Sequence, residues 1–92
     1  MYNLTKDDIT ILNFLSKNKC INVHLSMDKT KIMPSIQGMT DFKFNSSISR
    51  LEVCNLIGRI ATARPNKYYL KQDGINLLKL YVEDTQRSIK GK

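Results

Sequence analysis

The chain of 92 residues is poor in the residue types on which metal and redox chemistry depend. It has two cysteines, one histidine and no tryptophan. Cys20 and Cys54 lie far apart among apolar residues, so no cysteine pair has zinc-ligand spacing and we expect two reduced, half-buried thiols. His24 alternates with apolar neighbours and is expected to be a solvent-side strand residue. The sequence therefore predicts no metal site and no cofactor.

Long apolar runs are also missing. None approaches the roughly 18 residues that a membrane-spanning helix needs. The residues that follow Met1 (YNLTKDD) do not form the apolar segment of a signal peptide. We therefore expect a cytoplasmic protein without a membrane partner.

The chemistry of an enzyme is not visible in the sequence either. There is no paired-carboxylate motif, no nucleophile beside a base, and no glycine-rich loop that would hold a phosphate. We expect that the protein is not an enzyme.

The composition is that of a folded protein, with 41% hydrophobic and 25% charged residues. The length suits one domain, which we assign to residues 1–87, with residues 88–92 as a frayed basic tail. A chain of this size buries only a small core, so dimerisation would be a natural supplement to its stability.

Positive charge is concentrated in one segment. The formal net charge is +7. Residues 43–71 contribute +5 of it, because this segment holds six cationic side chains and one acidic side chain, Glu52. A cationic cluster on one face is typical of a protein that binds a polyanion. The alternative is a merely basic domain with a solvated charged face.

The first half of the chain predicts a helix, a strand and a second helix. Thr5 and Asp8 have the spacing of a capping box and precede an apolar stripe, which predicts a helix over about 5–17. Alternation of apolar and polar residues predicts a half-exposed strand over 21–25. Ser26 is the expected cap of a helix over about 27–36, which Pro34 should keep short, and Gly38 marks a turn.

The second half predicts a helix, a hairpin and a last helix. Thr40 is the expected cap of a helix over about 41–54, whose core stripe is Phe44, Ile48 and Leu51. Asn55 is expected to end that helix in the left-handed conformation. Two antiparallel strands, 57–62 and 67–71, should follow around a basic turn, and a helix over about 72–87 should close the domain.

The exposed face of the third helix is the candidate binding surface. The helix as a whole carries three serines, although serine is a poor helix former, so their presence asks for another reason than helix stability. Small hydroxyl, amide and cationic side chains on one face can reach both phosphates and base edges. The residues of that face, with its flanks, are Phe42, Lys43, Asn45, Ser46, Ser49, Arg50 and Val53.

Two segments resemble a known family. Residues 49–59 (SRLEVCNLIGR) resemble the exit of the recognition helix of winged helix-turn-helix proteins, and residues 68–74 (YYLKQDG) resemble the second wing strand. Asn55 replaces a usual Gly and Lys71 a usual Thr. The resemblance implies a mainly α fold with a small β-hairpin (α+β), a recognition helix in a major groove, and a wing that touches the DNA backbone or minor groove. The DNA-binding residues that it implies are Lys43, Asn45, Ser46, Ser49, Arg50, Arg59, Arg64 and Lys67.

Three functions follow as hypotheses. The first is a dimeric, sequence-specific binder of double-stranded DNA that regulates transcription. The second rests on a resemblance to the centromere-binding adaptors of tubulin-type plasmid or phage partition systems, which coat DNA repeats and recruit a filament-forming protein. The third is a protein–protein interaction module, which the basic face argues against.

The terminal helices are expected to form a homodimer interface. The last helix has more apolar residues than one inward stripe requires, and the first helix adds a further apolar pair. Contiguous exposed apolar surface usually marks an interface. The expected interface residues are Ile11, Phe14, Leu77, Leu80 and Tyr81.

Overall fold

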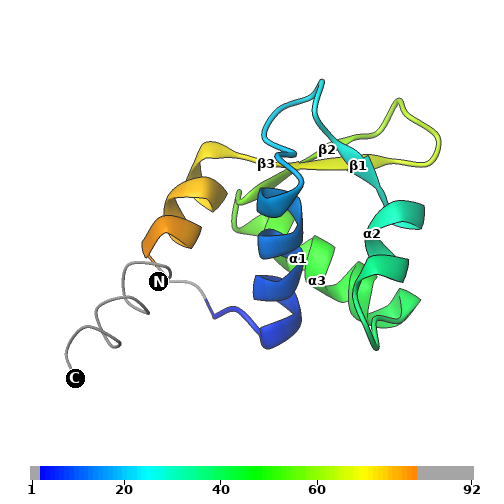
Figure 1. The fold of residues 1–92 in the computed structure, drawn as a ribbon, viewed down its shortest axis with the longest axis horizontal. Coiled ribbons are helices and arrows are strands. Elements are labelled where there is room, and N and C mark those ends of the chain that lie inside the picture. The colour runs from blue at the N-terminus through cyan, green and yellow to red at the C-terminus, as the bar shows by residue number, and fades with distance from the viewer. Residues whose placement is uncertain (1–2, 81–92) are drawn as a thin grey trace.

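The computed structural model describes residues 3–80 (Figure 1). A helix over 72–80 follows the last strand. The predicted α+β order of a winged helix-turn-helix, with one hairpin among helices, is confirmed. The named elements are α1 (Lys6–Lys17), β1 (Met27–Asp28), α2 (Lys29–Ser35), α3 (Asp41–Val53), β2 (Ile57–Ile60) and β3 (Lys67–Leu70).

The start of α1 follows the predicted capping box. The Thr5 hydroxyl accepts a hydrogen bond from the Asp8 amide at 3.2 Å, and the Asp8 carboxylate accepts one from the Thr5 amide at 3.0 Å. Both bonds satisfy amides that a helix leaves without partners at its first turn. Residues Ile11, Leu12 and Leu15 then face the core and are fully buried.

The predicted strand over 21–25 is wrong. The Asn22 side chain accepts hydrogen bonds from the amides of His24 and Leu25, which closes a tight turn, as asparagine does well. Ile21, Val23 and Leu25 are 46%, 51% and 50% exposed, so their alternation does not mark a buried strand face.

The second helix also begins later than predicted. Its cap is Asp28, whose carboxylate accepts from the Lys31 amide, and not Ser26. The strand β1 lies between, at Met27–Asp28. Pro34 lies within the last turn of α2, and the helix is short, as the sequence indicated.

The sheet has the order β1-β3-β2 with antiparallel pairing throughout. Met27 faces Tyr68 in the ladder, and the Cys20 carbonyl accepts from the Leu70 amide. Residues 21–26 therefore loop out from the sheet edge between two contacts that are only two residues apart on β3.

The exit from α3 and the hairpin follow the prediction with shorter strands. Asn55 has a φ of 62° and ends α3 in the left-handed conformation. The Lys71 ammonium donates to the Asn55 side-chain oxygen at 2.8 Å, so the two departures from the family pattern contact each other. Residues 57–70 are called the wing below. The loop between its two strands lies at the end of the molecule opposite helix 72–80 (Figure 1).

A single core joins all these elements. The predicted stripe of α3 is confirmed, because Phe44 and Leu51 are fully buried and Ile48 is nearly so. Phe44 meets Tyr68 of β3 edge to face, with ring centroids 5.7 Å apart. Both cysteines are free, as expected, and burial raises the pKa of the Cys20 thiol.

The terminal helix covers the open end of the core. Leu78 is buried and Leu77 packs against the core, whereas Leu80 is 58% exposed. Tyr81, the rest of the predicted helix to residue 87, and the predicted tail over 88–92 lie outside the described residues.

Candidate nucleic-acid interface

One face of α3 points away from the core. Phe42 and Val53, near its two ends, are 80% and 86% exposed. Ser46 and Ser49 lie between them at the helical spacing i, i+4, i+7 and i+11, so the four side chains form one line along the helix. This line, called the outer stripe below, is uncharged, and its small serines leave room for close approach of a partner.

Lys43 and Asn45 flank the outer stripe and are both exposed, as predicted. Lys43 lies in the first turn of α3, whose start is held by the Thr40 cap. Among residues 3–80, Lys43 has no acidic partner within ion-pair distance. Its ammonium group is therefore available to a phosphate.

Arg50 has a partner that the sequence did not reveal. Its Nε donates to Asp8 Oδ2 at 2.7 Å and its second terminal nitrogen donates to Asp8 Oδ1 at 3.0 Å. This bidentate pair joins the last turn of α3 to the first turn of α1, across 42 residues of sequence. In this structure the guanidinium faces Asp8, and the predicted base contact by Arg50 has no support from its position.

Asp8 is fully buried, and its surroundings favour the ionised carboxylate. Burial by itself would raise the pKa of its carboxyl group, but hydrogen bonds from Arg50 and the Thr5 amide, together with the nearby Ser47 hydroxyl, outweigh it, and the pKa is lowered. The Ser47 hydroxyl is buried beside this carboxylate, although its heavy-atom geometry falls short of a full hydrogen bond. Ser47 is thus the one serine of α3 that faces inward.

Arg59 of β2 is also paired. Its Nε and one terminal nitrogen each donate to the Glu52 carboxylate at 3.0 Å. The pair lies at the surface and fastens the wing to α3. Arg59 was predicted to bind DNA, and here its guanidinium is engaged by the only acidic residue of the cationic segment.

The wing carries two cations besides Arg59. Arg64 in the loop and Lys67 at the start of β3 are both exposed, as predicted. Neither has an acidic partner in the part of the chain that the structure describes. With Lys43 they form the set called the open cations below, one on α3 and two on the wing.

The helix-turn-helix pair is held by a further charge contact. Lys29, the first residue of α2, forms an ion pair with Asp41, the first residue of α3. The same ammonium lies 5.8 Å from the centre of the Phe44 ring, within cation–π range. The contact fixes α2 against the start of the recognition helix.

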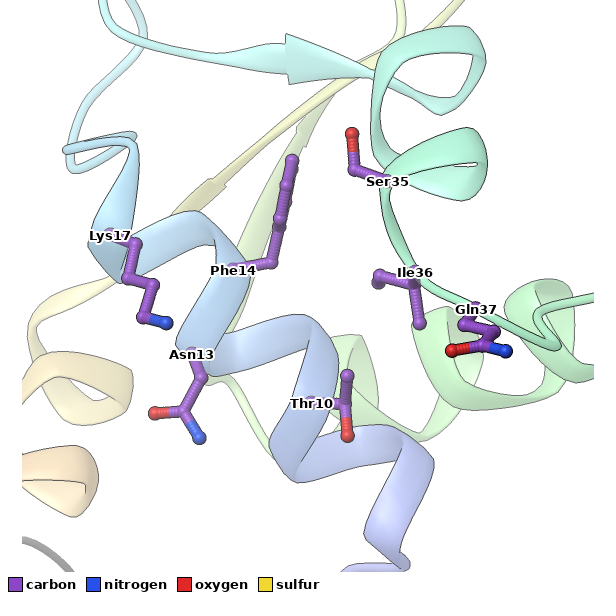
Figure 2. A pocket seen from close by; sticks show the side chains of 7 residues that line it. All are labelled: Thr10, Asn13, Phe14, Lys17, Ser35, Ile36 and Gln37. Carbon is purple, nitrogen blue, oxygen red and sulfur yellow. The ribbon is translucent and has the colours of Figure 1, made fainter.

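The predicted dimer residues of α1 do not both reach the surface. Ile11 is fully buried, because it faces the core with Leu12 and Leu15, so its place in an exposed apolar pair is wrong. Phe14 is half-buried and points toward Ser35 across a shallow hollow between α1 and the segment that follows α2 (Figure 2). The hollow is lined by Thr10, Asn13, Phe14, Lys17, Ser35, Ile36 and Gln37.

Within residues 3–80, no three acidic, histidine or cysteine side chains gather as metal ligands would. No helix in that range is long and apolar enough to cross a membrane.

Comparisons with known proteins give a consistent result. No family model matches the chain. It is 28% identical over 74 residues to the DNA-binding protein TubR of Priestia megaterium, covering 80% of this chain and 72% of the relative. The solved structure of TubR from Bacillus megaterium pBM400 matches with a TM-score of 0.82 and 24% identity, over 87% of this chain and 88% of that one.

These matches confirm the predicted resemblance to winged helix-turn-helix DNA-binding proteins. At 24% identity the structural match by itself shows the fold alone. Neither matched protein carries the name of an enzyme, and the expectation that this chain is not one stays a prediction.

Proposed function

We propose that this winged helix-turn-helix chain, which resembles the DNA-binding protein TubR, binds double-stranded DNA as an adaptor in plasmid or phage DNA partition. The observation that carries the proposal is the placement of the open cations both beside the uncharged outer stripe of α3 and on the wing. Lys43 lies on α3, and Arg64 and Lys67 lie on the wing.

The geometry suits a duplex. A major groove about 12 Å wide admits an α-helix, and the outer stripe with Asn45 would face the base edges there. The open cations would meet phosphates, which fix register and supply most of the affinity without carrying sequence information. In this arrangement the serines and Asn45 specify the site, and Lys43, Arg64 and Lys67 hold the protein on it.

Partition is the better supported biological role. The sequence resembles small centromere-binding adaptors, and the matched relative is named a DNA-binding protein and not a transcriptional regulator. The regulator hypothesis, placed first from sequence alone, has no comparable support in the comparisons. Under the partition hypothesis the protein would coat neighbouring repeats and recruit a filament-forming protein.

The proposal includes a homodimer. Leu80 exposes more than half of its surface on the last described turn of helix 72–80, which continues the apolar pattern of that helix. Burial of such a side chain in a second copy would add apolar contact area that the small core lacks. The proposed interface uses Leu77, Leu80 and Tyr81, with Phe14 on the first helix.

Selection of duplexes from a random pool, followed by footprinting of the natural locus, tests DNA binding. Recovery of a defined repeated sequence supports the proposal. Absence of binding to any duplex at low salt would refute it and favour a protein-interaction module.

Affinity should then be measured on one, two and four copies of the repeat. A binding curve that becomes steeper as the number of repeats rises supports partition, whereas equal and independent binding to each repeat supports a regulator.

A further inference from the structure

We propose that Asp8 is a positioning residue that withholds Arg50 from DNA phosphates, and that this masking lowers non-specific binding. The inference rests on the proposed DNA-binding function and concerns the same face of α3. It would make Asp8, a residue of α1, a determinant of specificity.

The geometry of the pair holds the Arg50 guanidinium against the Asp8 carboxylate. Both donors of one edge of the Arg50 guanidinium meet the two carboxylate oxygens of Asp8. Asp8 is fully buried, whereas 38% of the Arg50 side chain is exposed. Asp8 also accepts from the Thr5 amide, so the capping box of α1 fixes the carboxylate independently of Arg50.

Release of Arg50 would extend the cationic edge of α3. Arg50 lies seven residues after Lys43, two helical turns or about 10.5 Å along the same side of the helix. An unpaired arginine there would stand beside Ser46 and Ser49 and reach toward the phosphates of either strand. The ion pair therefore removes one cation per subunit from the surface that faces DNA.

Stability alone does not account for this arrangement. An ion pair with a buried carboxylate contributes little net stability compared with well-packed apolar side chains, because the carboxylate loses its hydration. A phosphate-binding cation, by contrast, raises affinity for every sequence alike. An adaptor that must find its own repeats gains specificity when that cation is neutralised by its own chain.

The first test is Asp8→Asn, which keeps the shape of the side chain and an oxygen for the Thr5 amide but removes the charge that holds Arg50. On random-sequence duplex, the slope of log affinity against log salt should steepen by about 0.9 for each phosphate that a released Arg50 contacts. The preference for the selected site over random sequence should fall several-fold.

Asp7→Asn is the matched control. It makes the same charge change in the same turn of α1, but Asp7 accepts no hydrogen bond from Arg50 in the structure. An equal effect of both variants would mean that net charge alone is responsible and would overturn the masking.

The double variant Asp8→Asn with Arg50→Gln covers the case in which Asp8→Asn unfolds. It replaces the ion pair by two amides, keeps the net charge, and leaves no buried charge without a partner. If Arg50 is masked in the wild type, the double variant should keep the wild-type salt slope. A slope lower by about 0.9 would show that Arg50 contacts a phosphate in the wild type and would contradict the inference. Failure of the wild type to bind duplex is a separate outcome, because it refutes the proposed function itself.

Discussion

Gly74 lies directly against the backbone carbonyl of Leu56. A Cβ at position 74 would come within 2.4 Å of the Leu56 oxygen, which already accepts a hydrogen bond from the Lys71 amide at 2.9 Å. The contact sets the angle at which helix 72–80 leaves the sheet. It also gives a physical reason for the glycine in the Asp73-Gly74 part of the wing motif.

Gly74→Ala should therefore destabilise the protein, by about 1–3 kcal/mol, because the backbone must shift to admit the methyl group. At an ordinary helical position the same change stabilises by up to about 1 kcal/mol, so the sign is diagnostic. Urea unfolding measures it. Gly38→Ala is a useful comparison, since Gly38 has a φ of 79° but open space around it, and should cost about 1 kcal/mol from backbone strain alone. A stabilised Gly74→Ala variant would contradict the contact.

Arg64→Gln and Lys67→Gln should weaken binding to all duplexes alike. Each removes one open cation of the wing, so the salt slope should fall by about 0.9 for each phosphate contact that is lost. Fluorescence anisotropy across a range of salt concentrations measures it. Lys79→Gln is the control, because Lys79 lies on helix 72–80, at the far end of the molecule from the wing (Figure 1). If the control changes the slope as much as the wing variants do, the wing is not the phosphate-binding element.

Phe42→Ala should weaken specific binding more than non-specific binding. An exposed aromatic ring on a recognition helix suits apolar contact with the methyl group of thymine. Loss of one such buried methyl contact costs about 0.8 kcal/mol. Replacement of thymine by uracil in the selected site tests the contact directly. Wild-type protein should lose affinity for the uracil duplex, and the Phe42→Ala variant should bind both duplexes equally. Equal binding by the wild type would exclude a thymine contact.

Stability should fall in acid. The pKa of Asp8 is lower in the folded protein than its ordinary value near 4, so folding favours the ionised form. The resulting stabilisation is complete above about pH 5 and is lost as pH falls through 4 toward the native pKa. The free energy of unfolding, measured by urea from pH 7 to pH 3, should therefore decline. Asp8→Asn should be less stable at pH 7 and should decline less steeply, and an identical pH profile would rule out Asp8 as the cause.

Leu80→Glu should shift the protein toward monomer, because a carboxylate cannot be buried in an apolar interface without a partner. Sedimentation equilibrium at micromolar concentration distinguishes the dimer from the 10.6 kDa chain. Gln72→Glu adds the same charge at an exposed polar position two turns before Leu80 on the same helix and should remain dimeric. A wild-type protein that sediments as a monomer would remove the dimer from the proposal.

Local signals predicted most of the helices and the wing. Thr5 and Thr40 cap helices where expected, and Asn55 ends α3 with a positive φ. Each depends on hydrogen bonds or backbone sterics within a few residues, so neighbouring side chains are sufficient to specify it. The exposed positions of Lys43, Asn45 and Ser49 followed from helical periodicity for the same reason.

The alternating segment 21–25 shows where local pattern fails. Its apolar residues have the period of a strand, but the Asn22 side chain offers the backbone a turn, and the neighbouring edge of β3 is already occupied by Cys20 and Met27. Which of two locally acceptable conformations forms depends on that distant strand. Ile11 is a similar case, since the width of the core that α1 covers decides whether it is buried.

The largest difference between the sequence prediction and the structure concerns which cations of the binding face are free of acidic partners. Composition placed six cations in residues 43–71, and periodicity placed Arg50 on the outward side of α3. Arg50 is nonetheless paired with Asp8, and Arg59 with Glu52, because folding brings those carboxylates within reach. The residue types, caps and periods are properties of the chain itself. Which cations remain open to DNA depends on contacts between residues up to 42 positions apart, and such contacts exist only after the helices have packed.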